Sequence, residues 1–256
     1  MPSVSRILDV TTSTLASQLR GWAGTAAFRP SASPPPKPVI LYEMENCPFC
    51  RLVRETLTTL ELDAEIRPCP KGGTRFRPDV LRLGGKAQFP FLVDPNHDRQ
   101  LYESADIIDY LRVTYGGGQA TAPRGLRRRA IVATSAAACA MRPTRGHKAR
   151  PSRAPAEPLE LYSFESSPFS RLVREVLCEL ELPYVLRNGG KARMQDMGTP
   201  ALRDRLFPGL TTAGRNRIAL EQRTGKIQFP YLIDPNVRTP DGGPTEMFES
   251  SEIMDY

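Results

Sequence analysis

The sequence predicts an α/β protein made of two copies of one small domain, each with the element order β-α-β-α-β-β-α. Residues 39–67 align with residues 159–187 at an offset of 120, and the pentapeptide Arg-Leu-Val-Arg-Glu is identical in both. Farther along the chain, a Gln-Phe-Pro segment and then a Glu-Ser pair recur in the same order. The offset grows to 140 and then to 146, so the second copy has about 20 extra residues before its Gln-Phe-Pro segment.

Each element of the first copy has its own signal in the sequence. Residues 39–43 read as a short apolar strand, and residues 48–60 carry apolar residues at helical spacing, which predicts a helix with one core-facing side. A second strand is expected at 64–67. The next helix, over 75–83, should end at Gly84-Gly85, because glycine accepts the left-handed conformation at a helix C-terminus.

The last third of the copy predicts a hairpin and a final helix. Residues 89–94 and 100–103 read as strands joined through an Asp-Pro-Asn turn. Ser104 is a candidate N-cap for a helix over 105–115, which a run of three glycines ends. A strand–helix–strand unit followed by a hairpin predicts a small mixed sheet covered by helices.

Four segments follow from this division: an N-terminal extension (1–36), a first domain (37–117), a connector (118–157) and a second domain (158–256). The formal net charge of the chain is +7, yet each domain is close to neutral. Residues 116–158 hold nine basic residues and one acidic residue. The positive charge therefore belongs to the connector.

The connector is rich in Pro, Arg and Ala, and a solvated linker is its simplest interpretation. Its charge also fits contact with an anionic membrane surface or an acidic partner. It has no aromatic residue on which bases could stack, which argues against nucleic-acid binding. Its Ala-rich run over 130–141 is too short to cross a bilayer and predicts a connector helix or a surface-lying segment.

The N-terminal extension has two interpretations. Residues 1–36 are rich in Ser, Thr and Ala with a single acidic residue, which is typical of an organelle transit peptide. The spacing of Ile7, Val10, Leu15 and Leu19 equally fits an amphipathic helix that stays in the mature protein. At the other end, the second copy stops at Tyr256, so its last helix is expected to be short and weakly ordered, or truncated.

Cys47 and Cys50 lie between the first strand and the first helix. A helix N-terminus offers unpaired N–H groups and the positive end of the helix dipole, and both stabilise a thiolate. Cysteines of Cys-X-X-Cys motifs in this position have pKa values lowered to roughly 3.5–7.5. Pro48 suits the first helical position because it has no N–H to leave unpaired. Cys47 as nucleophile and Cys50 as resolving thiol would provide the two groups that thiol–disulfide exchange requires.

Other interpretations of the pair stay open. The two cysteines could be metal or iron–sulfur ligands across a dimer, or inert core residues. A structural zinc site needs a second pair, which the other cysteines do not supply, so no resident metal is predicted. Cys69 is a spare resolving thiol or a loop residue, Cys139 falls in the Ala-rich run, and Cys178 is expected in a helix core. Five cysteines without a signal-peptide pattern argue against a secreted disulfide framework.

The motifs also carry a family resemblance. A strand, Cys-Pro-Phe-Cys opening a helix, Gln-Phe-Pro before a hairpin and Glu-Ser opening a last helix together resemble glutaredoxins and the N-terminal domain of glutathione S-transferases. Two such modules on a basic connector, with Asp-Pro-Asn in both, resemble more narrowly the tandem glutathione S-transferase N-terminal-like proteins of plants and algae. The resemblance implies two thioredoxin-like domains. It also implies a chloroplast location, either soluble or peripheral to the thylakoid membrane.

The same resemblance implies a glutathione site in the first copy. Pro90 matches the cis-proline that lies beside the active cysteine, and Glu103 and Ser104 match the pair that holds the γ-glutamyl end of glutathione. Independently of any family, a serine with free N–H groups at a helix start suits a carboxylate. Phe49 and Phe89 are expected to be apolar walls of the site or core residues.

The second copy departs from this pattern, because Ser167 and Ser170 replace the two cysteines. A serine hydroxyl cannot exchange disulfides, although some transferases activate glutathione with a serine at this position. We expect a degenerate domain kept for packing, or for binding. Its candidate binding residues are Ser167, Pro230, Glu249 and Ser250.

Together these observations predict a glutathione-linked, glutaredoxin-like oxidoreductase that acts on a disulfide or a glutathionylated protein. A glutathione transferase-like activity is the related enzymatic interpretation. The alternatives are a non-catalytic glutathione-binding or scaffold protein of the plastid, and iron–sulfur cluster binding through Cys47.

Overall fold

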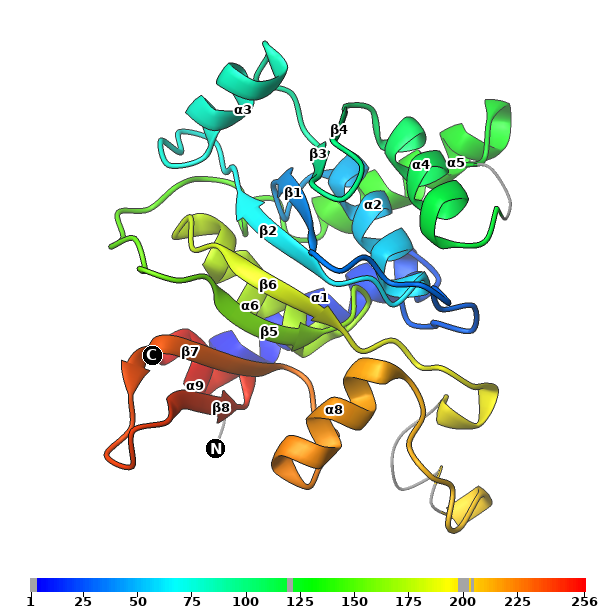
Figure 1. The fold of residues 1–256 in the computed structure, drawn as a ribbon, viewed down its shortest axis with the longest axis vertical. Helices are drawn as coiled ribbons and strands as arrows, with labels where there is room; N and C mark the ends of the chain where they lie inside the picture. The colour runs from blue at the N-terminus through cyan, green and yellow to red at the C-terminus, as the bar shows by residue number, and fades with distance from the viewer. Residues whose placement is uncertain (1–3, 119–121, 198–202, 204) are drawn as a thin grey trace.

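The computed structural model describes residues 4–118, 122–197, 203 and 205–256 (Figure 1). The elements are α1 (Val4–Leu19), β1 (Val39–Glu43), α2 (Pro48–Thr59), β2 (Ala64–Pro68), α3 (Arg77–Gly84), β3 (Phe91–Asp94), β4 (Arg99–Leu101), α4 (Ser104–Tyr115), α5 (Gly125–Ala140), β5 (Leu159–Ser163), α6 (Pro168–Glu179), β6 (Tyr184–Asn188), the 3-10 turn η1 (Met194–Asp196), α8 (Arg215–Thr224), β7 (Tyr231–Arg238), β8 (Pro244–Phe248) and α9 (Ser250–Asp255).

The predicted α/β class and the order of strands and helices in each copy are confirmed. The helix over Arg77–Gly84 ends as expected, since Gly85 takes the left-handed conformation and its N–H bonds the Leu81 carbonyl. One predicted detail is wrong. Ser104 is the first helical residue of α4, and Glu103 occupies the N-cap position instead.

The two copies share a single eight-stranded sheet, which the sequence did not indicate. Its strand order is β4-β3-β1-β2-β6-β5-β7-β8, and the copies join where β2 pairs antiparallel with β6. In that pairing Glu65 lies opposite Val185, its own counterpart at the offset of 120. A local two-fold relation between the copies therefore passes through the middle of the sheet.

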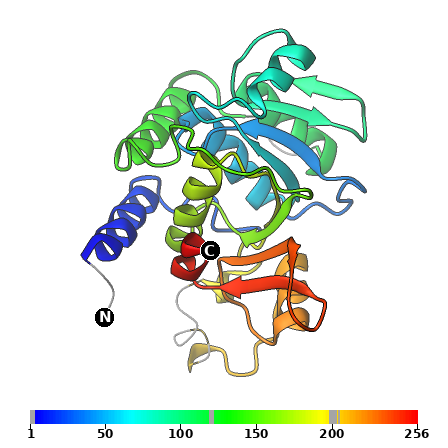
Figure 2. The same cartoon turned by 90° about the vertical axis from the view of Figure 1, so that its left-hand side faces the viewer.

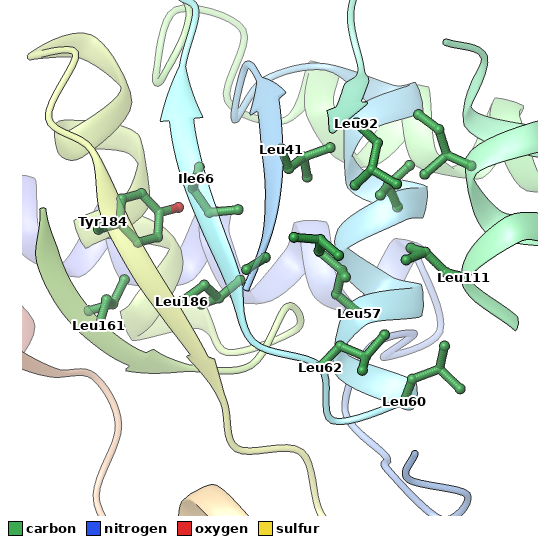
Figure 3. Close-up of a cluster of buried hydrophobic side chains, with 14 of the residues drawn as sticks. Leu41, Leu57, Leu60, Leu62, Ile66, Leu92, Leu111, Leu161, Tyr184 and Leu186 are labelled. Carbon is green, nitrogen blue, oxygen red and sulfur yellow. The ribbon is translucent and has the colours of Figure 1, made fainter. Parts of the chain in front are cut away.

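Alternate strand residues separate the two faces of the sheet. On β1, Val39 and Leu41 face a large apolar core with residues of α2 and α4, whereas Ile40 and Tyr42 face a smaller cluster with Val80 of α3. The large core continues across the β2–β6 junction (Figure 3). Apolar residues from both copies thus form one continuous core, and the copies cannot separate without exposing it.

Helices α1 and α5 lie on the same side of the sheet (Figure 2) and cover the first helix of each copy. Helix α1 packs on α6, and α5 packs on α2. The contacts are equivalent: Ser13 Oγ donates to the Pro168 carbonyl at 2.8 Å, and Ser135 Oγ donates to the Pro48 carbonyl at 2.8 Å. The duplication therefore extends into the N-terminal extension and the connector.

Two glycines mark the same equivalence. Gly24 and Gly146 both have positive φ, of 79° and 63°. A Cβ on Gly24 would lie 2.6 Å from Cβ of Glu165, and a Cβ on Gly146 would lie 2.9 Å from Cβ of Glu45. Each glycine is needed because the chain passes directly over the loop before a domain's first helix.

The connector is thus not a plain solvated linker. Residues 125–140 form a helix whose Ser135 and Ala138 are buried, and Arg142 after it is buried as well. In the N-terminal extension, Ser13, Ala16 and Ser17 are buried, so α1 is part of the packed structure. This packing favours the retained amphipathic helix, and cleavage of a transit peptide stays a prediction.

A buried ionic cluster ties the two copies together beneath the helices. Arg54 donates to the carboxylate of Glu165 at 2.8 Å, and Arg174 donates to the carboxylate of Glu45 at 3.1 Å. Each arginine also bonds the backbone carbonyl of the glutamate that the other one pairs with, at 3.1 Å. These four side chains are at most 6% exposed. Charge pairing across the junction is therefore reciprocal.

Glu43 breaks the symmetry of this cluster, because its counterpart is Ser163. Glu43 contacts the Arg54 guanidinium. Burial nevertheless raises the pKa of Glu43 to about 8, with Arg54 lowering it and the neighbouring Glu45 raising it. The first copy thus holds one more buried acid than the second at this position.

We predict that Arg54→Met destabilises the protein by about 3–5 kcal/mol, because it removes the buried guanidinium that contacts Glu43 and donates to Glu165. Arg82→Met, at an exposed pair with Asp79, should change stability by less than about 0.5 kcal/mol. Urea unfolding followed by circular dichroism measures both values. Similar losses for the two variants would contradict a special role for the cluster.

Candidate redox site

Cys47 is the N-cap residue of α2, with extended backbone angles and Pro48 at the first helical position, as the sequence predicts. Its Sγ accepts a hydrogen bond from the backbone N–H of Cys50 at 3.3 Å. A sulfur in this position takes the place of the usual capping oxygen and faces the positive end of the helix dipole. The geometry therefore favours a thiolate at Cys47.

The pKa of Cys47 is lowered to about 7. The largest contribution is a hydrogen bond from the Cys50 side chain; burial opposes it, and backbone N–H groups of Cys50 and Phe49 lower the pKa further. Arg54, from the junction cluster, adds a smaller lowering by its charge. At neutral pH a substantial part of Cys47 is therefore ionised.

Cys50 has the opposite character. It is fully buried one turn into α2, and burial raises its pKa well above the usual value for a thiol, with Cys47 raising it further. It therefore keeps its proton and donates to Cys47. A thiolate beside a protonated thiol is the arrangement that nucleophile and resolving cysteine require.

Three further predicted residues of the first copy, Phe49, Phe89 and Pro90, differ in their exposure. The peptide bond before Pro90 is cis, as predicted, and Pro90 is buried. Phe49 is 43% exposed on the first turn of α2. Phe89 lies partly buried under the Arg77 guanidinium, whose carbon is 4.9 Å from the ring centroid. Phe49 is thus an open apolar surface, whereas Phe89 belongs to the cluster on the α3 face.

Glu103 and Ser104 begin α4. Glu103 is exposed with a positive φ of 58°, a strained conformation for a residue other than glycine, and its carboxylate accepts from Gln88. Ser104 is buried, and its Oγ accepts from Arg128 of α5 at 3.2 Å. A cation therefore lies beside the serine that was predicted to hold a carboxylate.

Sequence reasoning missed the contribution of α5 to this site. Ser135 binds the Pro48 carbonyl and Arg128 binds Ser104, so α5 crosses the starts of both α2 and α4. Cys47 is only 7% exposed. A signal existed in the sequence, because Ser13 and Ser135 stand at an offset of 122, close to that of the main repeat.

The second copy reproduces the backbone of the site without its sulfurs. Ser167 caps α6 and accepts from the Ser170 N–H at 3.2 Å, and the bond before Pro230 is cis. Glu249 has a φ of 60° and its carboxylate accepts from Gln228. Ser250 Oγ is buried, and no hydrogen-bond partner for it is found among the described residues. The fold of the site is thus kept where its redox chemistry is lost.

The remaining cysteines are poor nucleophiles. Cys178 is buried in α6 and donates to the Gly146 carbonyl at 3.4 Å, and burial raises its pKa. Burial also raises the pKa of Cys69, and that of Cys139 to about 11.

In the described part of the chain, no group of three His, Cys, Asp or Glu side chains is placed to hold a metal ion. None of the described helices is long and apolar enough to cross a bilayer.

We predict that Cys50→Ala raises the pKa of Cys47, because it removes the strongest hydrogen bond to the thiolate. Peptide-resolved alkylation with iodoacetamide across pH 5–10 should give a midpoint near 7 for Cys47 in the native protein. The midpoint should be at least one pH unit higher in the variant. An unchanged midpoint would mean that the backbone N–H groups alone hold the thiolate.

Comparison with known proteins places the chain in a family. The family described as glutathione S-transferase, N-terminal domain, matches residues 41–119 and 161–256. A glutathione transferase of Bombyx mori is 29% identical, over 38% of this chain and 45% of that protein, with a TM-score of 0.31. Its complex with GTT is 30% identical over the same shares, with a TM-score of 0.32.

A delta-class glutathione transferase of Nilaparvata lugens is 28% identical, over 31% of this chain and 37% of that protein, with a TM-score of 0.28. The chain thus spans less than half the length of these transferases. No curated protein matches it. Because the family match covers most of the chain in two stretches, the protein belongs to the glutathione S-transferase N-terminal domain family and contains that domain twice.

Proposed function

We propose that the protein is a glutathione-linked thiol–disulfide oxidoreductase with its active centre in the first copy. The observation that carries the proposal is the Cys47 sulfur at the start of α2, with a pKa lowered to about 7 and a protonated Cys50 beside it. Thiolates, not thiols, attack disulfides, and an attacking thiol with a pKa near ambient pH is the most efficient.

The reaction begins when the Cys47 thiolate attacks the glutathione sulfur of a glutathionylated substrate. The substrate sulfur leaves as a thiolate and takes up a proton, and Cys47 is left in a mixed disulfide with glutathione. A second glutathione thiolate then attacks that glutathione sulfur, which releases oxidised glutathione and restores the Cys47 thiolate. Alternatively, Cys50 loses its proton and attacks Cys47 Sγ, so that glutathione leaves and a Cys47–Cys50 disulfide forms.

Binding of glutathione would use the residues around Cys47. The backbone beside Pro90 would pair with the glutathione backbone, and Glu103, Ser104 and the N-terminus of α4 would hold the γ-glutamyl end. Arg128 adds a positive charge for the γ-glutamyl carboxylate, because it already contacts Ser104. Phe49 would supply an exposed apolar wall next to the sulfur.

A second candidate is a non-catalytic glutathione-binding or scaffold protein. Two observations favour it: the second copy keeps the backbone of the site without cysteines, and Cys47 is only 7% exposed beneath α5. In that case the lowered pKa of Cys47 would have no catalytic use. A chloroplast location stays a prediction under both candidates.

We predict that Cys47→Ser abolishes glutathione-dependent reduction of a glutathionylated peptide, with a rate at least 100-fold lower than native. Cys50→Ser should keep most of this activity, because the route through the second glutathione needs only Cys47. The measurement is the rate at which oxidised glutathione forms, recorded by coupling the reaction to glutathione reductase.

Cys139→Ser is the matched control, because Ser17 occupies the position equivalent to Cys139 in the other half of the molecule. It should leave the rate unchanged. If the native protein binds glutathione in calorimetry but reduces no mixed disulfide, the enzymatic proposal is wrong and the non-catalytic glutathione-binding or scaffold function is supported. Equal activity of native protein and Cys47→Ser would do the same.

A further inference from the structure

A small cavity of about 10 Å³ lies where the two copies of the domain meet the connector. Its walls come from the loop before α2, from α2 and α6 themselves, and from the end of α5 with the residues that follow it. This volume is about the space that one water molecule needs. Any occupant is therefore a single small molecule or a monatomic ion.

The charged side chains around the cavity are four arginines and two glutamates: Arg51, Arg142, Arg145, Arg171, Glu45 and Glu175. Both carboxylates are already paired. Arg142 donates to both oxygens of Glu175, at 2.6 and 2.7 Å, and Arg174 donates to both oxygens of Glu45, at 3.1 Å. The positively charged groups in the cavity wall are therefore in excess over the carboxylates.

Arg51 and Arg171 are equivalent residues of the two copies, at the offset of 120, and only 2% and 4% of them is exposed. Arg51 pairs through Nε with Glu55 at 3.4 Å and with Glu165 at 3.7 Å. Nevertheless, Arg51 Nη2 and Arg171 Nε are buried nitrogens for which no hydrogen-bond partner is found among the described residues. A buried donor without an acceptor destabilises the folded state, so two such donors on one cavity indicate an acceptor inside it.

The connector takes the expected partner of Arg171. Glu175 lies four residues after Arg171 on α6, which is the spacing of an ion pair within a helix. Both oxygens of Glu175 instead accept from Arg142, which follows α5. Arg171 donates through Nη2 to Ser17 Oγ at 2.9 Å, and it forms no ion pair with any residue that the structure describes. Its buried charge is thus left without a counter-charge in contact.

The electrostatics of Arg171 agree with this geometry. Burial lowers its pKa to about 10, and the charge of Arg51 lowers the pKa further, whereas the charge of Glu165 opposes both effects. The guanidinium still carries its charge at neutral pH. An anion between Arg51 and Arg171 would offset their mutual repulsion and would accept from both unpartnered N–H groups.

We propose that this cavity binds one monatomic anion, of which chloride is the abundant example, through Nη2 of Arg51 and Nε of Arg171. A water molecule accepts the same two hydrogen bonds, but it has no charge to set against the two guanidinium groups. Carboxylate, sulfate and phosphate groups are larger than the cavity. The bound ion would join α2 to α6 and so stabilise the junction between the copies. The proposal does not depend on redox chemistry at Cys47.

The first test is the dependence of thermal stability on chloride. The Tm of the full chain is measured by circular dichroism between about 1 and 200 mM sodium chloride, with sodium methanesulfonate added to keep the ionic strength constant. Because the anion binds only the folded state, Tm should rise by at least about 2 °C over this range. A Tm that does not change with chloride would overturn the proposal and indicate that water satisfies the two arginines.

Variants test the location. Arg171→Met removes one of the two donors, and Cys139→Leu places a larger side chain in the cavity wall at a partly buried position. Both should make Tm independent of chloride. Arg82→Met also removes one positive charge, from exposed α3, and should keep the native dependence. A chloride dependence that both cavity variants retain would overturn the proposal, because the ion would then bind elsewhere.

The Nε–H group of Arg171 reports binding directly in ¹H–¹⁵N NMR spectra of the native protein, and its absence in Arg171→Met assigns the signal. Added chloride at constant ionic strength should shift this signal or replace it by a second one, with saturation, and should leave the Nε–H signal of Arg82 unchanged. An Arg171 signal that does not respond would overturn the proposal even if the cavity variants fail to fold.

Cys47→Ser should show the same chloride dependence of Tm as the native protein, because Cys47 does not line the cavity. Loss of the redox activity in that variant would leave the anion site intact. Failure of the proposed function and failure of the anion site are therefore observed separately.

Discussion

The reciprocal pairing of Arg54 with Glu165 and of Arg174 with Glu45 is the interaction on which the rest of the structure depends. Buried charges are tolerated only when each has its partner and its hydrogen bonds, so the two copies must meet in one register. The antiparallel β2–β6 pairing and the continuous apolar core independently fix the same register between the two copies. The duplicated domains therefore form one structural unit.

This junction also bears on the chemistry of Cys47. The helix that carries Arg54 begins at the Cys47 sulfur, and the Arg54 charge contributes to the lowered pKa of that thiol. The identical pentapeptide at the start of the first helix in each copy is explained by the junction rather than by catalysis. It supplies Arg51, Arg54 and Glu55 to the buried ionic contacts. In the second copy Arg174 and Glu175 form ion pairs, whereas Arg171 donates to Ser17 Oγ. The second copy could thus lose its cysteines and still keep its structural role.

Helices α1 and α5 extend the two-fold arrangement beyond the two copies of the domain. Each helix covers the first helix of a domain, with equivalent serine contacts at its centre. Over the first copy, α5 packs on α2, and its Ser135 donates to the carbonyl of Pro48, the residue after Cys47. Arg128 of α5 also reaches the start of α4, where it donates to Ser104 Oγ. The segments outside the family domain thus belong to the same packed structure as the two copies.

The sequence by itself determined the duplication, the order of elements and the position of Cys47 at a helix start, because these depend on local periodicity and short motifs. It also indicated the cis-prolines through a family resemblance. It did not reveal the shared sheet, the ionic junction or the covering helices, since the residues that meet there are 87 to 155 positions apart. Only the tertiary structure decided how exposed Cys47 is, because the burial of a side chain depends on which distant segments pack around it.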